Sequence, residues 1–176
     1  MKAVIFTEEA KTVAKDADDL ALIDYFKGQF RPVTTLVKEL SEVSDTDVYI
    51  FSDEYGLCEG RMSISEAEQM NRKGNLQKDA QEAIRNSIPE ADIVIILLTK
   101  DIFSSVVEPI WDEIVESTKQ DSIWGLGLSQ GAIDTIDIEP LREKSDLYVY
   151  RRSGVARLGT ETRDQLLSAV RRQDLK

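Results

Sequence analysis

The sequence of 176 residues contains no histidine and only one cysteine, Cys58. Without histidine, the chain cannot assemble a Ser-His-Asp triad, a Cys-His dyad or a metal site with histidine ligands. A single cysteine cannot form a disulfide within the chain, and a zinc site of the Cys/His type is excluded as well. The side-chain chemistry that remains for a functional site is that of carboxylates, hydroxyls, amides and amines.

Long apolar runs and an excess of positive charge are also absent. No apolar run approaches the roughly 20 residues that a membrane-spanning helix needs. The first strand-like residues turn acidic at Glu8 and Glu9 before any signal-peptide pattern develops, so we expect a cytoplasmic protein with no membrane partner. The 33 acidic and 22 basic residues give a net charge of −11, which disfavours binding to duplex nucleic acid.

The composition is that of a folded domain. Apolar residues make up 41% of the chain and charged residues 31%, a balance typical of globular and not of disordered proteins. A length of 176 residues suits one α/β domain. We therefore predict a single domain over residues 1–176, in which residues 147–176 could add a β-hairpin and a C-terminal helix as an appendage.

Short apolar runs alternate with longer amphipathic stretches, which is typical of βαβ units. The strands predicted from the apolar runs are 3–6, 48–51, 92–98, 122–125, 147–150 and 155–158. The helices predicted from the amphipathic stretches are 18–26, 33–40, 63–88, 102–117 and 162–170. A capping box at Thr162 should open the last helix. The pattern predicts an α/β domain with a mainly parallel central sheet of about five or six strands flanked by helices, a Rossmann-like arrangement.

In such a sheet, ligands bind beyond the carboxyl ends of the strands. The polar residues at these ends could bind a sugar or a base, or perform general acid–base chemistry. As candidate catalytic residues we take Asp53, Glu54 and Asp101. As candidate ligand-binding residues we take Thr7, Ser52, Tyr55, Gly56, Thr99, Gly125, Gly127 and Ser129. The same residue types are common in loops that bind nothing, so a purely structural role stays open for each of them.

The glycines from Gly125 to Gly131 allow two interpretations. Their spacing, G-x-G-x-x-x-G, could form a backbone cradle for phosphate, but it matches neither the dinucleotide fingerprint nor the Walker motif. A tight turn after the strand is the alternative. The three candidate carboxylates could hold Mg²⁺ only if they converge, and we assign neither a metal nor a cofactor.

The cysteine and the large aromatic residues also have two interpretations each. Cys58 has no histidine to activate it, so a packing role is favoured over a nucleophilic one. Trp111 and Trp124 are expected to fill the core. Tyr55 is the better candidate for stacking on a base.

One segment resembles a known family. Residues 48–57, which include Ser52 and the run from Asp53 to Leu57, are similar to the strand-Ser-Ala-Lys-Tyr-Gly-Leu signature of small α/β proteins of unknown function related to the YaaA peroxide-stress family. Residues 24–31 resemble the Leu-Tyr…Gly…Phe-Arg/Lys segment of the same proteins, and the likeness extends over residues 1–120. It implies an α/β fold and a role in oxidative stress, DNA binding or defence. Here Asp53 and Glu54 replace Ala-Lys, which reverses the charge and puts a contact with phosphate in doubt.

These observations favour a protein that binds, and could hydrolyse, a nucleoside- or nucleotide-like small molecule at the strand ends. The alternative is a non-enzymatic accessory subunit of a stress or defence system, which binds a protein partner or a second copy of itself. Its candidate apolar faces are residues 102–107 and the C-terminal helix. A third hypothesis is nucleic-acid binding through the basic pairs Arg151–Arg152 and Arg171–Arg172, against which the net charge argues.

Overall fold

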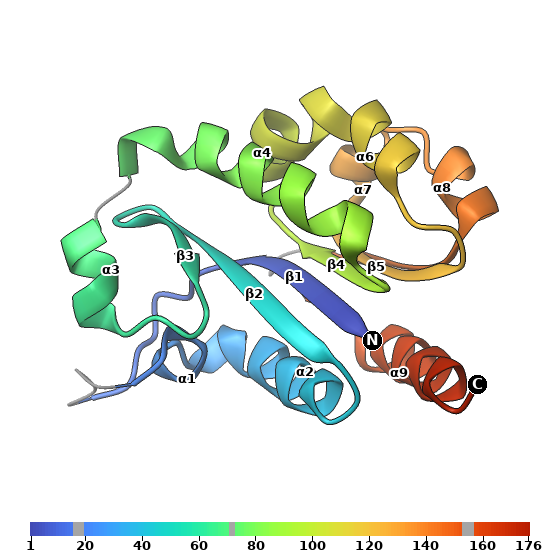
Figure 1. Cartoon of the computed structure of the whole chain (residues 1–176). Helices are drawn as coiled ribbons and strands as arrows, with labels where there is room; N and C mark the ends of the chain where they lie inside the picture. The colour runs from blue at the N-terminus through green and yellow to red at the C-terminus, as the bar shows by residue number, and fades with distance from the viewer. Residues whose placement is uncertain (16–19, 71–72, 153–156) are drawn as a thin grey trace.

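The structure, a computed structural model, describes residues 1–15, 20–70, 73–152 and 157–176, and a six-stranded sheet lies at its centre (Figure 1). Its strands follow the order β3-β2-β1-β4-β5-β6, and all neighbours are parallel except β2 and β3. The strands are β1 Lys2–Glu8, β2 Asp45–Ser52, β3 Gly56–Glu59, β4 Ile93–Leu97, β5 Ser122–Ser129 and β6 Ser145–Arg152. The predicted α/β arrangement with a mainly parallel sheet is confirmed.

Helices cover both faces of this sheet (Figure 1). One face carries α1 (Leu22–Tyr25), α2 (Arg31–Ser41) and α9 (Thr160–Asp174). The other carries α4 (Leu76–Ser87), α5 (Lys100–Ile102), α6 (Trp111–Ser117), α7 (Gln130–Ile133) and α8 (Glu139–Lys144). Helix α3 (Ile64–Met70) lies beyond the β3 edge. Within the described ranges, no helix combines the length and the apolar character that crossing a membrane requires.

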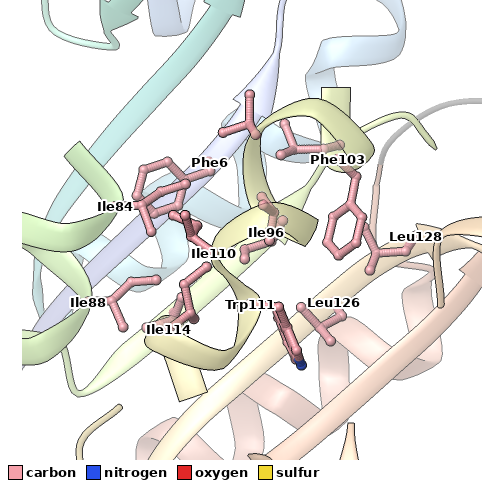
Figure 2. Close-up of a cluster of buried hydrophobic side chains, with 14 of the residues drawn as sticks. Phe6, Ile84, Ile88, Ile96, Phe103, Ile110, Trp111, Ile114, Leu126 and Leu128 are labelled. Carbon is pink, nitrogen blue, oxygen red and sulfur yellow. The ribbon is translucent and has the colours of Figure 1, made fainter. Parts of the chain in front are cut away.

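The central strands are buried on both faces, as their continuous apolar runs predict. All five residues of β4 are buried. Side chains of β1 alternate between two clusters: Ala3 and Ile5 pack under α2 and α9, and Val4 and Phe6 pack under α4 and α6. Figure 2 shows the second cluster, in which Phe6, Ile96 and Leu126 of three adjacent strands face the helices above them.

Both tryptophans lie in this second cluster, as predicted. Trp124 is fully buried in β5, and Trp111 of α6 packs edge-to-face against it with ring centroids 6.4 Å apart. The indole N–H of Trp111 donates a hydrogen bond of 2.9 Å to the carbonyl oxygen of Asp137. Neither ring is free to stack on a base.

The two long predicted helices are interrupted. The stretch predicted over residues 63–88 forms two helices, α3 and α4. A short 3₁₀ turn, Lys73–Asn75, directly precedes α4, and residues 71–72 lie outside the described ranges. The stretch over 102–117 passes through a π-helical turn, Phe103–Val107, and a 3₁₀ turn, Glu108–Ile110, before α6 begins. Pro109 has no N–H to donate within the helix, which accounts for the break.

The predicted last strand and last helix both need correction. Of residues 155–158, Val155 and Ala156 lie outside the described ranges, and Arg157 and Leu158 are not in a strand. The sheet reaches six strands through β3, Gly56–Glu59, which was not among the predicted strands. Helix α9 begins at Thr160 and not at Thr162, because Gly159 is its N-cap and accepts the Arg163 N–H at 2.9 Å.

The two apolar faces considered for partner binding are already packed. In residues 102–107, Phe103, Val106 and Val107 are buried in the core, and the apolar stripe of α9 packs against β5 and β6. Strand β6 pairs with β5 along its whole length, from Ser145 to Arg152. The described residues of the predicted appendage, 147–152 and 157–176, thus supply a strand of the sheet and a helix packed on it, and neither face is open to a partner.

Candidate functional site

The crevice between β1 and β4 is the switch point of the sheet. From β1 the chain crosses one face through α2 to reach β2, whereas from β4 it crosses the other face through α6 to reach β5 (Figure 1). Because these connections diverge, the carboxyl ends of the two strands are left open between them, and ligands bind there in open α/β sheets. Glu8 ends β1, and Thr99 follows the end of β4.

Glu8 and Thr99 are joined across this crevice. Both the backbone N–H and the hydroxyl of Thr99 donate to the Glu8 carboxylate, and the hydroxyl contact is 3.0 Å long. Burial raises the pKa of the Glu8 carboxyl above its ordinary value, while the Thr99 hydrogen bonds and the charge of Arg152 limit the rise. A carboxyl shifted in this direction is better suited to exchange protons near neutral pH.

Arg152, at the end of β6, reaches over the same edge of the sheet. Its side chain donates from Nη2 to the carbonyl oxygen of Leu98 at 3.1 Å, and only 8% of the residue is exposed. Burial lowers the pKa of the Arg152 guanidinium, and the charge of Glu8 opposes this shift. Among the described residues, Arg152 Nε and the buried hydroxyl of Thr7 have no hydrogen-bond partner.

A cavity of about 620 Å³ opens beside Glu8. We call it the Glu8 cavity; its lining residues are Glu8, Glu9, Ala10, Lys11, Thr12, Gly28, Gln29, Phe30, Val33 and Thr99. The loop after β1 forms its wall by pairing with the segment before α2: Lys27 N–H donates to the Thr12 carbonyl at 2.8 Å. Gly28 has a φ of +61°, and a Cβ there would lie 3.1 Å from the Thr12 side chain, so this wall requires glycine.

Of the candidate site residues, Thr99 lines the Glu8 cavity, and Thr7 lies buried in β1 one residue before Glu8. Ser52, Tyr55 and Gly56 belong instead to the hairpin turn between β2 and β3. The Ser52 hydroxyl accepts the Tyr55 N–H at 3.1 Å, and Gly56 has a φ of +83° that closes the turn. Their sequence pattern is thus explained by the hairpin.

Tyr55 is half-buried against the cluster under α2 and α9, and it does not line the Glu8 cavity. Burial and the nearby carboxylates of Glu54 and Glu68 raise the pKa of Tyr55 to about 12. The phenol is therefore neutral at neutral pH. Its ring packs within the fold. Tyr55 lies between β2 and β3, whereas the switch point lies between β1 and β4.

The three candidate catalytic carboxylates do not gather. Asp53 and Glu54 are exposed on the hairpin turn, whereas Asp101 is exposed on α5. In the part of the chain that the structure describes, no three His, Cys, Asp or Glu residues lie close enough together to hold a metal ion. The convergence that a shared Mg²⁺ site would require is not seen, since Asp53 and Glu54 lie on the hairpin turn and Asp101 lies on α5.

Gly125 and Gly127 lie inside β5, with hydrogen-bonded strands on both sides, so their backbone cannot cradle phosphate. A Cβ on Gly127 would come within 2.3 Å of the Arg157 carbonyl oxygen, and one on Gly125 within 2.7 Å of Leu166. These glycines allow the segment before α9 to pack directly on the sheet. Ser129 caps α7, since its hydroxyl accepts the Ala132 N–H at 3.2 Å.

Cys58 is buried in β3, with 2% of its surface exposed, which matches the packing role and not that of a reactive thiol. The candidate groups that the sequence analysis did not place at the strand-end site are Glu8, and Arg152, which it considered only as half of a basic pair. Glu8 could have been chosen because it directly follows an apolar run. Arg152 could not, because adjacent arginines at 151–152 suggest an exposed pair, and only the alternation of β6 turns the second one inward.

Comparisons with protein-family models, with curated proteins and with solved structures find no match to this chain. Its function is therefore inferred from the geometry of the site.

Proposed function

We propose that this chain binds a nucleoside- or nucleotide-like small molecule in the Glu8 cavity, with Glu8 as the central polar group. The observation that carries the proposal is a partly buried carboxylate, with a raised pKa, lining a cavity of about 620 Å³ at the switch point of the sheet. Cavities of about 300–1,000 Å³ are typical of small-ligand sites.

The cavity lining suits a ligand with hydroxyl or amino donors and one apolar part. A carboxylate offers about four acceptor positions, and the two contacts from Thr99 leave the others for a ligand. A ribose diol or the amino group of a base supplies matching donors. Phe30 and Val33 provide the apolar wall, and Lys11 and Gln29 add polar groups at the rim.

Hydrolysis of such a ligand would require a group that transfers a proton. Glu8 is the residue at this site whose pKa is raised by burial, so it is the candidate acid or base. Asp53 and Glu54, on the hairpin turn, and Asp101, on α5, are exposed and are less suited to this task. Any turnover should therefore depend on Glu8 and not on those three residues.

The resemblance to relatives of the YaaA family, and with it a role in stress or defence, remains a prediction. An accessory subunit would need an open apolar face, and the two faces considered for it are buried in the described structure. The small-molecule hypothesis therefore has the better structural support.

The experiment is a thermal-shift screen of the four ribonucleosides and their 5′-monophosphates against the full chain. At least one should raise the melting temperature of the wild type. Glu8→Gln should lose this response, whereas Tyr55→Ala and the exposed control Glu116→Gln should keep it. The proposal is overturned if no compound shifts the wild type or if Glu8→Gln responds like the wild type. Incubation of the bound compound, followed by chromatography, then tests for hydrolysis.

A further inference from the structure

A second cavity, of about 670 Å³, lies on the other side of the start of α2. Phe30 and Val33 face the Glu8 cavity, whereas Arg31 and Thr35 line the second one. The first turns of α2 are thus a shared wall, and a ligand that extends past this wall would enter both cavities. On the opposite side, the second cavity is lined by Tyr150 of β6 and by the residues that lead into α9.

This second cavity gathers positive charge in an acidic protein. Arg31, Arg157 and Arg163 line it, together with one acidic residue, Glu161. We call it the arginine cavity. Among the described residues, Arg31 and Arg157 form no ion pair, and the ion pair of Arg163 is with its neighbour Asp164, at 3.2 Å.

Three guanidinium groups repel one another when they share a cavity, and a chain with a net charge of −11 has many carboxylates that could have paired with them. Folding instead places Arg31 and Arg157, which are far apart in the sequence, on the walls of one cavity. Guanidinium groups without carboxylate partners present planar donors that match phosphate oxygens. An anion in this cavity would relieve the repulsion.

One further feature adds donors at the same place. The first turn of α9 has no side-chain cap, because its N-cap is Gly159, and the helix is 15 residues long. The Tyr150 ring packs on Gly159, where a Cβ would lie 2.4 Å from the ring, so the uncapped turn is held in position.

We propose that the arginine cavity binds the phosphate group of a mononucleotide whose nucleoside part occupies the Glu8 cavity. This inference rests on the proposed function and narrows it, since it makes the ligand a nucleotide and not a nucleoside. Phosphate is held by Arg31 and Arg157 and by the first turn of α9. The carboxylate of Glu8 meets the uncharged part of the ligand, on the other side of the wall formed by α2.

Isothermal titration of the full chain tests this arrangement. The probes are inorganic phosphate, pyrophosphate, and each ribonucleoside paired with its 5′-monophosphate. The variants are Arg31→Gln and Arg157→Gln, and the control is Arg171→Gln, which removes the same charge from an exposed position in the last turn of α9.

The wild type should bind a monophosphate about tenfold or more tightly than the matching nucleoside, because charge-assisted hydrogen bonds to phosphate are added. Each cavity variant should remove most of this advantage and leave nucleoside affinity unchanged. Arg171→Gln should behave like the wild type.

The possible failures are distinguishable. If a nucleoside binds but phosphate adds no affinity, or if the arginine variants change nothing, the phosphate site is overturned while the proposed function stands. If inorganic phosphate binds through Arg31 and Arg157 but no nucleoside or nucleotide does, the proposed function fails, and with it the two-cavity ligand. A short RNA that binds more tightly than every mononucleotide would overturn the small-molecule occupant in favour of nucleic acid.

Discussion

The carboxyl groups of Glu8 and Asp92 lie at opposite ends of the sheet, and their pKa values are shifted in opposite directions. Asp92, before β4, accepts hydrogen bonds from the Lys2 N–H at 2.8 Å and from Lys119 at 2.5 Å. Burial opposes the shift, but these contacts hold the pKa of Asp92 below its ordinary value. At the opposite edge, burial dominates at Glu8 and its pKa is raised. The fold thus stabilises the charged form of Asp92 and the protonated form of Glu8.

The pH dependence of stability should therefore differ in sign at the two positions. Because the pKa of Glu8 is raised on folding, its contribution to stability is complete below the ordinary pKa and is lost as the pH rises through the raised value. Glutamine stays neutral throughout. As the pH rises above about 4, the ordinary pKa of a glutamate, the free energy of unfolding of the wild type should fall relative to that of Glu8→Gln until the raised pKa is passed. Urea denaturation at a series of pH values measures this.

Asp92→Asn is the matched control for that experiment. The pKa of Asp92 is lowered on folding, so its contribution is present above the ordinary pKa and is lost as the pH falls through the lowered value. The wild type should therefore gain stability over Asp92→Asn as the pH rises. Parallel curves for Glu8→Gln and the wild type would show that the carboxyl of Glu8 has no raised pKa in the folded protein.

The glycines of β5 matter because of what packs on them. In Gly127→Ala, the new Cβ would meet the Arg157 carbonyl oxygen at 2.3 Å, and a backbone atom cannot rotate away. We expect a loss of about 1–3 kcal/mol in the free energy of unfolding, typical of an overpacked core. Gly74→Ala is the control, since nothing lies within 4 Å of a Cβ there. Chemical denaturation in which both variants lose equally would contradict the packing role of Gly127.

At the scale of elements, the segment from Lys100 to Ser117 shows how a broken helix is supported by its neighbour. Pro109 cannot donate to the carbonyl of Ser105, and Gln77 of α4 donates its Nε2–H to that oxygen instead, at 2.9 Å. Gln81 does the same for Val106 at 3.1 Å. The side chains of one helix therefore donate to carbonyl groups in the irregular part of the next helix.

This replacement predicts a coupling between Gln77 and Pro109. Gln77→Ala should cost about 0.5–1 kcal/mol in the wild type, since a carbonyl loses its hydrogen-bond partner. In the Pro109→Ala background, the restored N–H can serve the Ser105 carbonyl, so Gln77→Ala should cost less. A double-mutant cycle by urea denaturation measures the difference. Strictly additive effects would show that Gln77 does not substitute for the missing N–H.

The elements that the sequence predicts well are those buried on both faces. The run Ile93–Leu97 is apolar throughout, because both of its faces are covered, and it can be recognised without tertiary information. Strand β3 is not recognisable in this way, since it has four residues, lies at the edge and pairs in the antiparallel sense with β2. The π-helical turn before Pro109 is likewise invisible to a pattern that counts apolar spacing.

The site was harder to predict than the fold because its residues depend on packing. The polar residues Ser52 to Gly56 follow a strand, but they close a hairpin with their own hydrogen bonds. The spacing of Gly125 and Gly127 suggests a phosphate-binding loop. In the structure, Arg157 and Leu158, which precede α9, pack directly on these glycines. The sequence shows that Glu8 follows an apolar run. Its burial and its hydrogen bonds with Thr99 depend on the pairing of β1 with β4, which are far apart in the sequence.

At the scale of the whole molecule, charge is distributed unevenly. The chain carries 33 acidic and 22 basic residues, yet three arginines share one cavity at the carboxyl edge of the sheet. The remaining surface is therefore more acidic than the net charge alone indicates. Such a surface repels itself in the folded state, and the positive cavity becomes the place where a small anion is attracted.

This self-repulsion makes stability depend on salt. At neutral pH, raising NaCl from about 10 mM to about 150 mM shortens the screening length from about 30 Å to about 8 Å. The melting temperature should rise by about 2–4 °C, which corresponds to roughly 1 kcal/mol in a chain of this size. Near pH 4.6, the isoelectric point of the sequence, the net charge is close to zero and the same salt should have little effect. Equal salt dependence at both pH values would show that ions act through specific sites or solvent structure, and that the distributed acidic surface does not limit stability.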